Sequence, residues 1–410
     1  MRLLLKKWNT LKQVIRYYGG KAVQAVLFAV FRLLPYRRNR IVFSSFCGKS
    51  YSDNPRAIYE YLVGHYPGKF RYVWLFDYSS EPVIPKDKLR GVRFAPIDSY
   101  RSSYYKATSG FWVFNHRNTS YFYKKKGQFY IQTWHGDLGF KGFDALSIPK
   151  EKYDTPYVRK CIKDSSMLDA LIVGSEWGYN TMKKAFFWPD GDYWKCGYPR
   201  ADILFHPEKS DAYAQVRAHY GIDPDTHLCL YAPTFRPGFR IGESLFRDGR
   251  NGFLQILEAH EKRFGGKWAM LFRVHPACLA EEKKMGLDFG EGVFDASAYG
   301  DMTDLMVACD TLITDYSCTS FEFSLSGKPC WLLMDDFEQY CKSMTIVVDP
   351  KEVLFDQCKD LPALLDAIAR FDENAYRQDM RRMHVGFGSY EKGEASAYVA
   401  SRMVDYLERK

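Results

Sequence analysis

Short apolar runs recur along most of the chain, and polar or helix-like stretches separate them. Runs of this kind are typical of strands buried on both faces of a parallel sheet. The first half contains Arg40–Phe46, Tyr72–Phe76, Trp112–Phe114, Phe129–Thr133 and Ala170–Val173. The second half contains Leu228–Ala232, Ala269–Val274, Thr311–Thr314, Cys330–Leu333 and Thr345–Val348. The stretches between them include predicted helices at Asn54–Val63 and Ser175–Ala185, so the alternation predicts an α/β fold.

A polar segment around Phe205–Ser210 divides the two series of strands and is the predicted linker. We therefore expect two Rossmann-like, doubly wound domains, residues 40–205 and 206–385, which face a central cleft. Ligands of such sheets bind beyond the carboxyl ends of the strands. The tail Leu361–Lys410 has a helical pattern. Its last part, residues 386–410, is predicted to pack back on the body.

Residues 1–39 form a predicted amphipathic arm. Apolar side chains between Leu4 and Tyr18 recur at three- and four-residue spacing, with Lys and Arg between them. Gly19-Gly20 should interrupt this helix, and Ala22–Leu34 is predicted to be a second, more apolar helix that is too short to span a bilayer. No convincing secretory signal is present. A basic amphipathic helix is typical of the surface of an anionic membrane. The alternative is a soluble arm, or one that packs on another subunit.

The net charge of +9 belongs to this arm. Residues 1–40 hold ten basic and no acidic residues, and the remainder of the chain holds 48 basic and 49 acidic residues. A nucleic-acid enzyme more often spreads basic residues over its body, so we expect no nucleic-acid partner. The 10 cysteines are scattered without a CxxC pair, which disfavours a zinc ribbon and fits a reducing compartment.

Four polar clusters follow predicted strands. Gln132–Asp137 contains His135, which titrates near neutral pH and can serve as a general base. Tyr231–Arg236 and Arg273–Pro276 each contain an arginine, whose guanidinium can grip phosphate with two hydrogen bonds. Ile313–Ser320 leads into a predicted helix, whose first free N–H groups favour anions. Each cluster alone has an ordinary structural interpretation, but four at the ends of strands predict a site for a nucleotide diphosphate.

Other known motifs are absent. Gly48-Lys49-Ser50 resembles the end of a phosphate-binding P-loop, but Phe43 stands where that loop needs its first glycine. No Asp-rich metal motif is evident, so the sequence requires no metal or other cofactor, and a water-bridged Mg²⁺ stays open.

Together these stretches resemble the CDP-glycerol glycerophosphotransferase family, which includes teichoic acid primases and polymerases. The matching segments are Phe46–Tyr61, Gln132–Asp144, Gly197–Asp202, Tyr231–Arg236, Arg273–Pro276 and Ile313–Pro329. The resemblance implies a GT-B fold with the active site between its domains and CDP-glycerol mainly on the second domain. It also implies that His275 and the Thr314–Ser317 turn contact the donor diphosphate, and that His135 is the base or a phosphate contact.

We accordingly expect two catalytic residues, His135 and His275. The expected substrate-binding residues are Trp134, Gly136, Arg236, Arg273, Thr314, Asp315, Tyr316, Ser317, Ser320 and Glu322. The implied reaction transfers glycerol phosphate from CDP-glycerol to a hydroxyl of a lipid-linked or polymer acceptor and releases CMP, in the synthesis of teichoic acid or a related cell-surface or capsular polymer. Members work as peripheral proteins at the cytoplasmic face of the bacterial cell membrane.

Four residues depart from the family's usual pattern: Asp137-Leu138, where Thr-Pro is frequent, Phe235 and Cys318. They leave CDP-ribitol open as the donor. A GT-B sugar transferase that uses a UDP- or GDP-sugar, and a membrane-bound scaffold with a degenerate site, are the rival interpretations. The sequence does not choose between a primase and a polymerase, and it sets neither the acceptor nor the oligomeric state.

Overall fold

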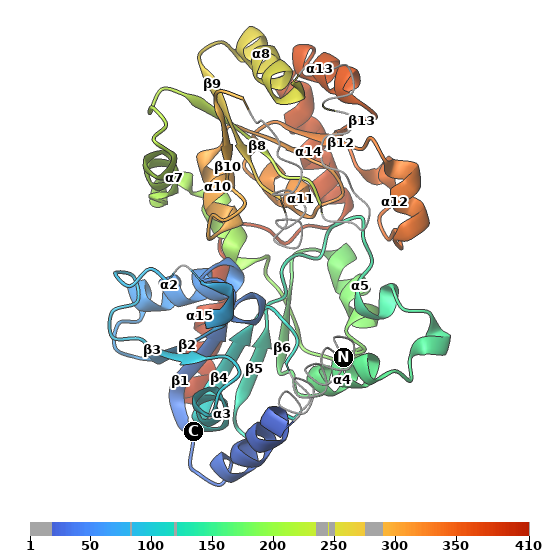
Figure 1. Cartoon of the computed structure of the whole chain (residues 1–410). Helices are drawn as coiled ribbons and strands as arrows, with labels where there is room; N and C mark the ends of the chain where they lie inside the picture. Colours follow the sequence, from blue (N-terminus) through green and yellow to red (C-terminus); the bar gives the residue numbers. More distant parts are fainter. Residues whose placement is uncertain are drawn as a thin grey trace, which may run out of the picture.

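Two parallel β-sheets organise the chain, one in each half (Figure 1). The computed structural model describes residues 19–82, 84–118, 121–234, 245, 251–274 and 290–409. The first sheet has the order β3-β2-β1-β4-β5-β6-β7 and the second the order β10-β9-β8-β11-β12-β13. The strands of the first are β1 (Arg37–Ser44), β2 (Arg71–Phe76), β3 (Arg93–Pro96), β4 (Ser109–Phe114), β5 (Phe129–Gln132), β6 (Ala170–Val173) and β7 (Tyr193–Lys195). Those of the second are β8 (His227–Tyr231), β9 (Trp268–Phe272), β10 (Val293–Asp295), β11 (Thr311–Thr314), β12 (Cys330–Leu333) and β13 (Asp356–Cys358).

In each sheet the first three strands are added in one direction, and the later strands are added on the opposite side of the first strand. This is the doubly wound arrangement. The reversal lies between β1 and β4 in the first sheet and between β8 and β11 in the second. Ligands of doubly wound sheets bind at this switch point, beyond the carboxyl ends of the strands. The predicted α/β, GT-B type architecture is thus confirmed, and the switch points indicate where its site lies.

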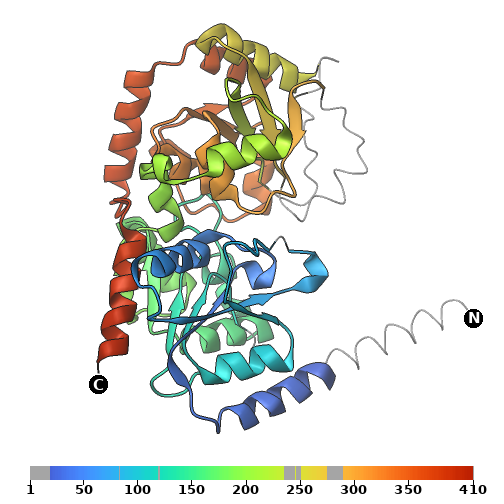
Figure 2. The ribbon, with the colours of Figure 1, turned by 90° about the vertical axis from the view of Figure 1, so that its left-hand side faces the viewer.

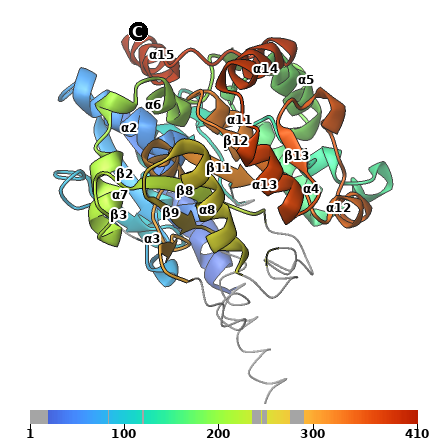
Figure 3. The ribbon, with the colours of Figure 1, turned by 90° about the horizontal axis from the view of Figure 1, so that it is seen from above.

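Helices cover the sheets and join the two halves. Those before the second sheet are α2 (Asp53–His65), α3 (Tyr100–Thr108), α4 (Pro156–Ser165), α5 (Glu176–Ala185), α6 (Asp202–Phe205) and α7 (Ala212–Tyr220). Those that follow are α8 (Gly252–Phe264), α10 (Met302–Ala308), α11 (Thr319–Ser324), α12 (Phe337–Ser343), α13 (Leu361–Ala369), α14 (Glu373–Gly386) and α15 (Ala395–Glu408). Helices α8 and α13 lie side by side over the second sheet (Figure 3).

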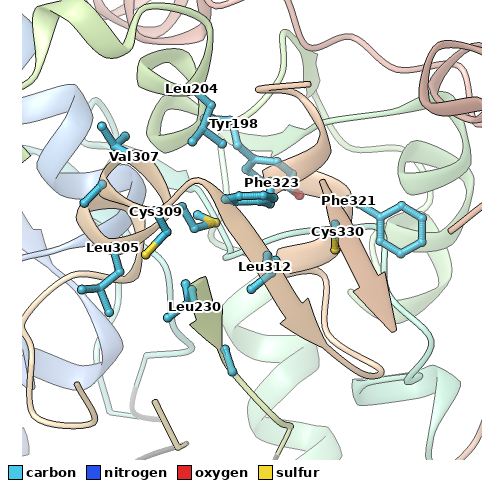
Figure 4. Packing of buried hydrophobic residues seen from close by; sticks show 14 of the residues in the cluster. Tyr198, Leu204, Leu230, Leu305, Val307, Cys309, Leu312, Phe321, Phe323 and Cys330 are labelled. Atoms are coloured by element: carbon cyan, nitrogen blue, oxygen red, sulfur yellow. The ribbon is translucent and has the colours of Figure 1, made fainter. Parts of the chain in front are cut away.

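The hydrophobic core is continuous between the halves. Tyr198 and Leu204 come from the first half and Phe323 from the second, and the three side chains lie together in one buried cluster (Figure 4). Phe140, in the loop after β5, contacts the ring of Phe321 in α11. Because apolar burial is worth about 25 cal/mol per Å², this shared core stabilises the contact between the two sheets.

One predicted strand was wrong. Thr345–Val348 belongs to neither sheet. Instead it runs beside the loop after β5: the Gly142 N–H donates to the Thr345 carbonyl at 2.8 Å, and the Val347 N–H donates to the Phe140 carbonyl at 2.9 Å. The segment is thus paired with a loop of the first half rather than with a strand, and of its four residues only Val348 is buried.

The C-terminal segment crosses from the second half to the first. Helix α14 lies beside the second sheet and α15 runs along the first (Figure 2). The Tyr406 ring of α15 packs on Phe129 at 4.5 Å between centroids, and Lys69 pairs with Glu408 at 2.5 Å. Gly388 lies in the segment between these two helices, and its carbonyl accepts from the Glu176 N–H of α5 at 2.9 Å.

Residues 19–31 form a helix at the base of the first half (Figures 1 and 2). The predicted interruption at Gly19-Gly20 was wrong, since both glycines are helical. Phe28 is buried and packs edge-on against Phe122 at 4.9 Å. The part of the arm before residue 19 lies outside the described residues. No helix within the described ranges is long and apolar enough to cross a membrane.

Candidate active site

The loop after β5 brings His135 to the face between the two sheets. Trp134 adopts a left-handed backbone conformation with φ +50°, and Gly136 follows with φ +115°. A Cβ at Gly136 would lie 3.0 Å from the Cys318 sulfur and 3.3 Å from Glu322 Oε1. Gly136 is therefore needed because the second half of the chain approaches the backbone closely at this point.

The tautomer of His135 follows from one hydrogen bond. Its Nδ1 lies 3.1 Å from the Asn115 carbonyl oxygen, which can only accept, so Nδ1 carries the proton and Nε2 is a basic lone pair. Burial lowers the pKa of His135, which keeps the ring neutral at pH 7. Trp134 stacks on the imidazole at 4.3 Å and fixes its plane. The role of His135 as a general base stays a prediction.

The fourth cluster lies at the switch point of the second sheet and is tied to the second cluster. The Thr314 hydroxyl donates to the Ala232 carbonyl at 2.7 Å, and Asp315 accepts from the Thr234 N–H at 2.9 Å. Tyr316 donates to Asp336 at 2.8 Å. All three of the predicted residues are buried. They build the framework of the turn, and their predicted contacts with substrate stay predictions.

Ser317 is more open than Thr314, Asp315 and Tyr316. It is half-buried, whereas Ser320 is fully buried and donates to the Ser317 carbonyl at 2.9 Å. The Ser317 hydroxyl accepts from the Thr319 N–H at 3.2 Å at the start of α11. Within this turn, Ser317 therefore offers a hydroxyl nearest to the surface.

Arg273 follows β9 and has structural partners. Its Nη1 donates to the carbonyls of Ala296 and Tyr299 at 2.9 and 2.8 Å, so it holds the segment after β10. Its predicted contact with phosphate stays a prediction. His275 and Arg236 lie outside the described residues.

Asp137, one of the departures from the family's usual pattern, faces away from His135. Its carboxylate accepts from the N–H groups of Gly174 at 2.7 Å and Ser175 at 3.0 Å, at the start of α5. Burial raises its pKa to about 6. This departure therefore changes the support of the loop rather than the groups beside the His135 ring.

Arg200 is a largely buried residue of this site that the sequence analysis did not single out. It lies in the turn after β7 and forms ion pairs with Asp53 and Glu322, and its Nη2 donates to the His135 carbonyl at 2.9 Å. Glu322, predicted to bind substrate, is thus engaged with Arg200. The available signal was Gly197–Asp202, a matching segment with one arginine between apolar and turn residues. Among the described residues, no group of three or more His, Cys, Asp or Glu side chains is placed to hold a metal ion.

Comparisons with known proteins agree with this geometry. The chain is 26% identical over 415 residues to the teichoic acid poly(glycerol phosphate) polymerase of Bacillus spizizenii, covering 98% of this chain and 99% of that protein. It is 29% identical to the polymerase of the same description from Staphylococcus epidermidis, covering 88% of this chain but 49% of that longer protein. A structure of the wall teichoic acid polymerase TagF, a variant with CDPG, superposes with a TM-score of 0.79 at 25% identity over 98% of each chain.

A family profile also matches almost the whole chain. Residues 26–405 match the family described as CDP-Glycerol:Poly(glycerophosphate) glycerophosphotransferase. This range includes both sheets, the loop of His135 and the turn at Ser317. The chain therefore belongs to the CDP-glycerol:poly(glycerophosphate) glycerophosphotransferase family.

Proposed function

We propose that this protein transfers glycerol phosphate from CDP-glycerol to a hydroxyl group of a lipid-linked or polymeric acceptor and releases CMP. The observation that carries the proposal is the neutral His135 ring, whose Nδ1–H is held by the Asn115 carbonyl. Family membership over residues 26–405 supports the choice of donor. The product would be a teichoic acid or a related polymer of the cell surface.

The proposed step is a single displacement at phosphorus. His135 Nε2 accepts the proton of the acceptor hydroxyl while the hydroxyl oxygen bonds to the β-phosphorus of CDP-glycerol. The bond from that phosphorus to the bridging oxygen breaks, and CMP leaves with the bridging oxygen and its electron pair. Positioning and electrostatic stabilisation supply most of the catalysis of such steps.

The donor diphosphate is proposed to lie at the switch point of the second sheet. Ser317 offers its hydroxyl there, and Arg236 and His275 are proposed to supply cationic or hydrogen-bonding groups. The ties of Thr314 and Asp315 to the loop after β8 support this placement, because they hold the turn rigid beside β11. A rigid site loses less entropy when it binds a charged donor.

We further propose that the protein works at the cytoplasmic face of the bacterial membrane, attached through the arm. The helix of residues 19–31 buries Phe28 and turns other apolar side chains outward: Val23 and Val26 are 59% and 64% exposed, and Leu33 just beyond it is 86% exposed. Apolar side chains with basic neighbours favour the interface of an anionic bilayer. A lipid-linked acceptor would be held at the same surface.

Competition between donors tests the proposal. Purified protein with a lipid-linked acceptor should release CMP from CDP-glycerol, and excess UDP- or GDP-sugar should not slow this release. Faster CMP release from CDP-ribitol than from CDP-glycerol would assign the ribitol donor instead. Turnover of a UDP- or GDP-sugar would replace the proposal with a sugar transferase, and no turnover of any donor would leave a scaffold.

A further inference from the structure

Two arginines whose side chains are 14% and 12% exposed, Arg56 and Arg200, join the halves of the chain, and one of them touches the candidate base. Arg56, in α2, pairs with Asp301 at 3.0 Å and with Asp304 at 2.8 Å. Arg200 pairs with Asp53 and Glu322 and also donates to the His135 carbonyl at 2.9 Å. Arg56 also pairs with Glu60 of its own helix at 3.1 Å. Each arginine therefore has acidic partners in both halves of the chain, and Arg200 differs by its bond to the backbone of His135.

Arg200 connects three segments that are far apart in the sequence. Its backbone N–H donates to the Asn54 side chain at 3.0 Å, and the same side chain donates to the Trp134 carbonyl at 3.0 Å. From the first half of the chain, Asp53 and the His135 carbonyl thus contact the guanidinium, while Asn54 ties the Arg200 backbone to the Trp134 carbonyl. Glu322 approaches it from the second half.

The backbone that Arg200 holds is strained. Trp134 has φ +50° and Asp53 has φ +66°, a region that side-chain-bearing residues rarely occupy. Such residues persist only where the surroundings determine them, and they gather at functional sites. Arg200 and Asn54 provide such surroundings. Arg200 pairs with Asp53 and donates to the His135 carbonyl, and Asn54 donates to the Trp134 carbonyl.

From these contacts we infer that Arg200 is a positioning residue of the transfer reaction, which fixes the main chain of His135 and does so only when Glu322 from the second half is in place. The inference rests on the proposed function of His135. Arg200 itself touches neither the reacting atoms nor the imidazole ring in this arrangement. Its action passes through the peptide of His135 and so sets the direction of Nε2.

Charge gives Arg200 a second effect on His135. Four charged or titratable groups interact electrostatically with the imidazole of His135. They are Asp53, Arg200, Asp144 and His116, which lies just after β4. Asp53 raises the pKa of His135 and Arg200 lowers it. Without Arg200, the carboxylate of Asp53 is no longer balanced, so the pKa of His135 rises and less of the base is neutral at pH 7.

The test compares Arg200→Met with Arg56→Met in the full-length protein. Both variants remove a largely buried arginine that pairs with acidic residues of both halves of the chain, and we expect both to unfold at lower temperature. Arg200→Met should lower kcat for CMP release from CDP-glycerol by roughly 10²-fold, because misplaced catalytic groups cost rates of that order. The KM for CDP-glycerol should change by less than about 3-fold, since an interaction that serves only the transition state lowers kcat alone. Arg56→Met should keep kcat within about 3-fold of the wild type.

The pH profile distinguishes a positioning role of Arg200 from a purely structural one. In Arg200→Met the acidic limb of kcat/KM should move to higher pH, and in Arg56→Met it should stay. Arg200→Lys retains the positive charge but not the fork that reaches both acids and the carbonyl. It should therefore lose kcat with little movement of the acidic limb, and it remains informative if Arg200→Met does not fold.

A spectroscopic readout keeps this inference distinct from the proposed reaction. The imidazole signal of His135, assigned by its loss in His135→Gln, can be titrated by NMR without any substrate. A rise of its pKa in Arg200→Met but not in Arg56→Met supports the inference even if the wild type releases no CMP, a result that would overturn only the proposed function. Equal kcat losses in the two arginine variants, or an unmoved His135 titration, would overturn the positioning role.

Discussion

At the scale of single residues, His135 depends on atoms that lie outside its own loop. The carbonyl of Asn115, at the end of the neighbouring strand β4, accepts from Nδ1 and leaves Nε2 without a proton. The ring of Trp134 covers one face of the imidazole. The local sequence Trp-His-Gly provides the turn, while the proton on the ring is assigned by a partner twenty residues earlier.

Replacing His135 should remove most of the turnover. We expect His135→Ala to lower kcat for CMP release by about 10²–10⁴-fold, the usual contribution of a general base. His260→Ala is the control, since His260 is buried and its hydrogen bonds among the described residues go to Ile256 and Thr311 within the second half. The control should lose stability and keep kcat. Turnover of folded His135→Ala close to that of the wild type would remove His135 from the mechanism.

The pH dependence of the wild type should show the lowered pKa of His135. The base is active when it is neutral, so kcat/KM falls as the pH drops through the pKa of the free enzyme. Since burial places this pKa below the ordinary value of 6.5, activity should persist at pH 6.5 and decline only in more acidic solution. Rates of CMP release across pH 4 to 8, on protein shown to stay folded, provide the measurement. An acidic limb centred above 6.5 would contradict this environment.

The sequence alone identifies His135 more readily than Arg200. A histidine next to glycine after an apolar run is visible as a candidate in the printed chain. An arginine between Pro199 and Ala201 has the pattern of a surface cation, because its partners Asp53 and Glu322 lie far away in the sequence. Long-range ion pairs of this kind carry no periodic signal.

At the scale of elements, apolar pattern predicted the long buried strands and missed the short ones. The strands β6 and β9 are apolar throughout and buried. The strands β7, β10 and β13 have three residues each, too few for a pattern to show. Thr345–Val348 has the composition of a strand, but its partners are in the loop of Phe140 and Gly142. An apolar pattern indicates that a segment packs against other parts of the protein, but it does not show which parts these are.

Glycine in α5 offers a test of the packing behind the His135 loop. A Cβ on Gly178 would lie 1.7 Å from the buried Asp137 carboxylate, whereas a Cβ on Gly64 in α2 meets nothing within 4 Å. Gly178→Ala should therefore destabilise the protein by about 1–3 kcal/mol, as overpacking does. Gly64→Ala should stabilise it by up to about 1 kcal/mol, because alanine favours helix.

Thermal unfolding followed by circular dichroism measures both glycine variants. We expect a lower melting temperature for Gly178→Ala and an unchanged or higher one for Gly64→Ala. Equal melting temperatures for the two variants would show that α5 does not hold Asp137 as tightly as these contacts indicate.

At the scale of the whole molecule, the described part of the arm is joined to the body. Phe28 is buried against Phe122, and Phe31 packs on Tyr104 at 5.6 Å. A truncation that removes this helix would expose the core beneath it. The region to delete is therefore residues 1–18, which hold five of the ten basic residues of the arm and leave Phe28 in place.

Deletion of residues 1–18 should weaken binding to vesicles that contain anionic lipid. The lost cations each contribute about 1 kcal/mol near such a surface, and added salt should weaken the binding of the full chain because screening shortens the reach of charge to about 8 Å at 0.15 M. Co-sedimentation at two salt concentrations measures this, with turnover on a short soluble acceptor as the control for folding. Equal sedimentation of both proteins would show that this segment is not the attachment.

The identity of the transferred group is the most direct test of the proposed reaction. Mass spectrometry of the product made from one defined lipid-linked acceptor, with CDP-glycerol or CDP-ribitol as donor in separate reactions, measures it. We predict that the acceptor gains whole glycerol phosphate units from CDP-glycerol, with one CMP released for each unit, and that His135→Ala forms no such product. An acceptor that gains only ribitol phosphate, or that stays unchanged while the folded protein binds CDP-glycerol, would contradict the account.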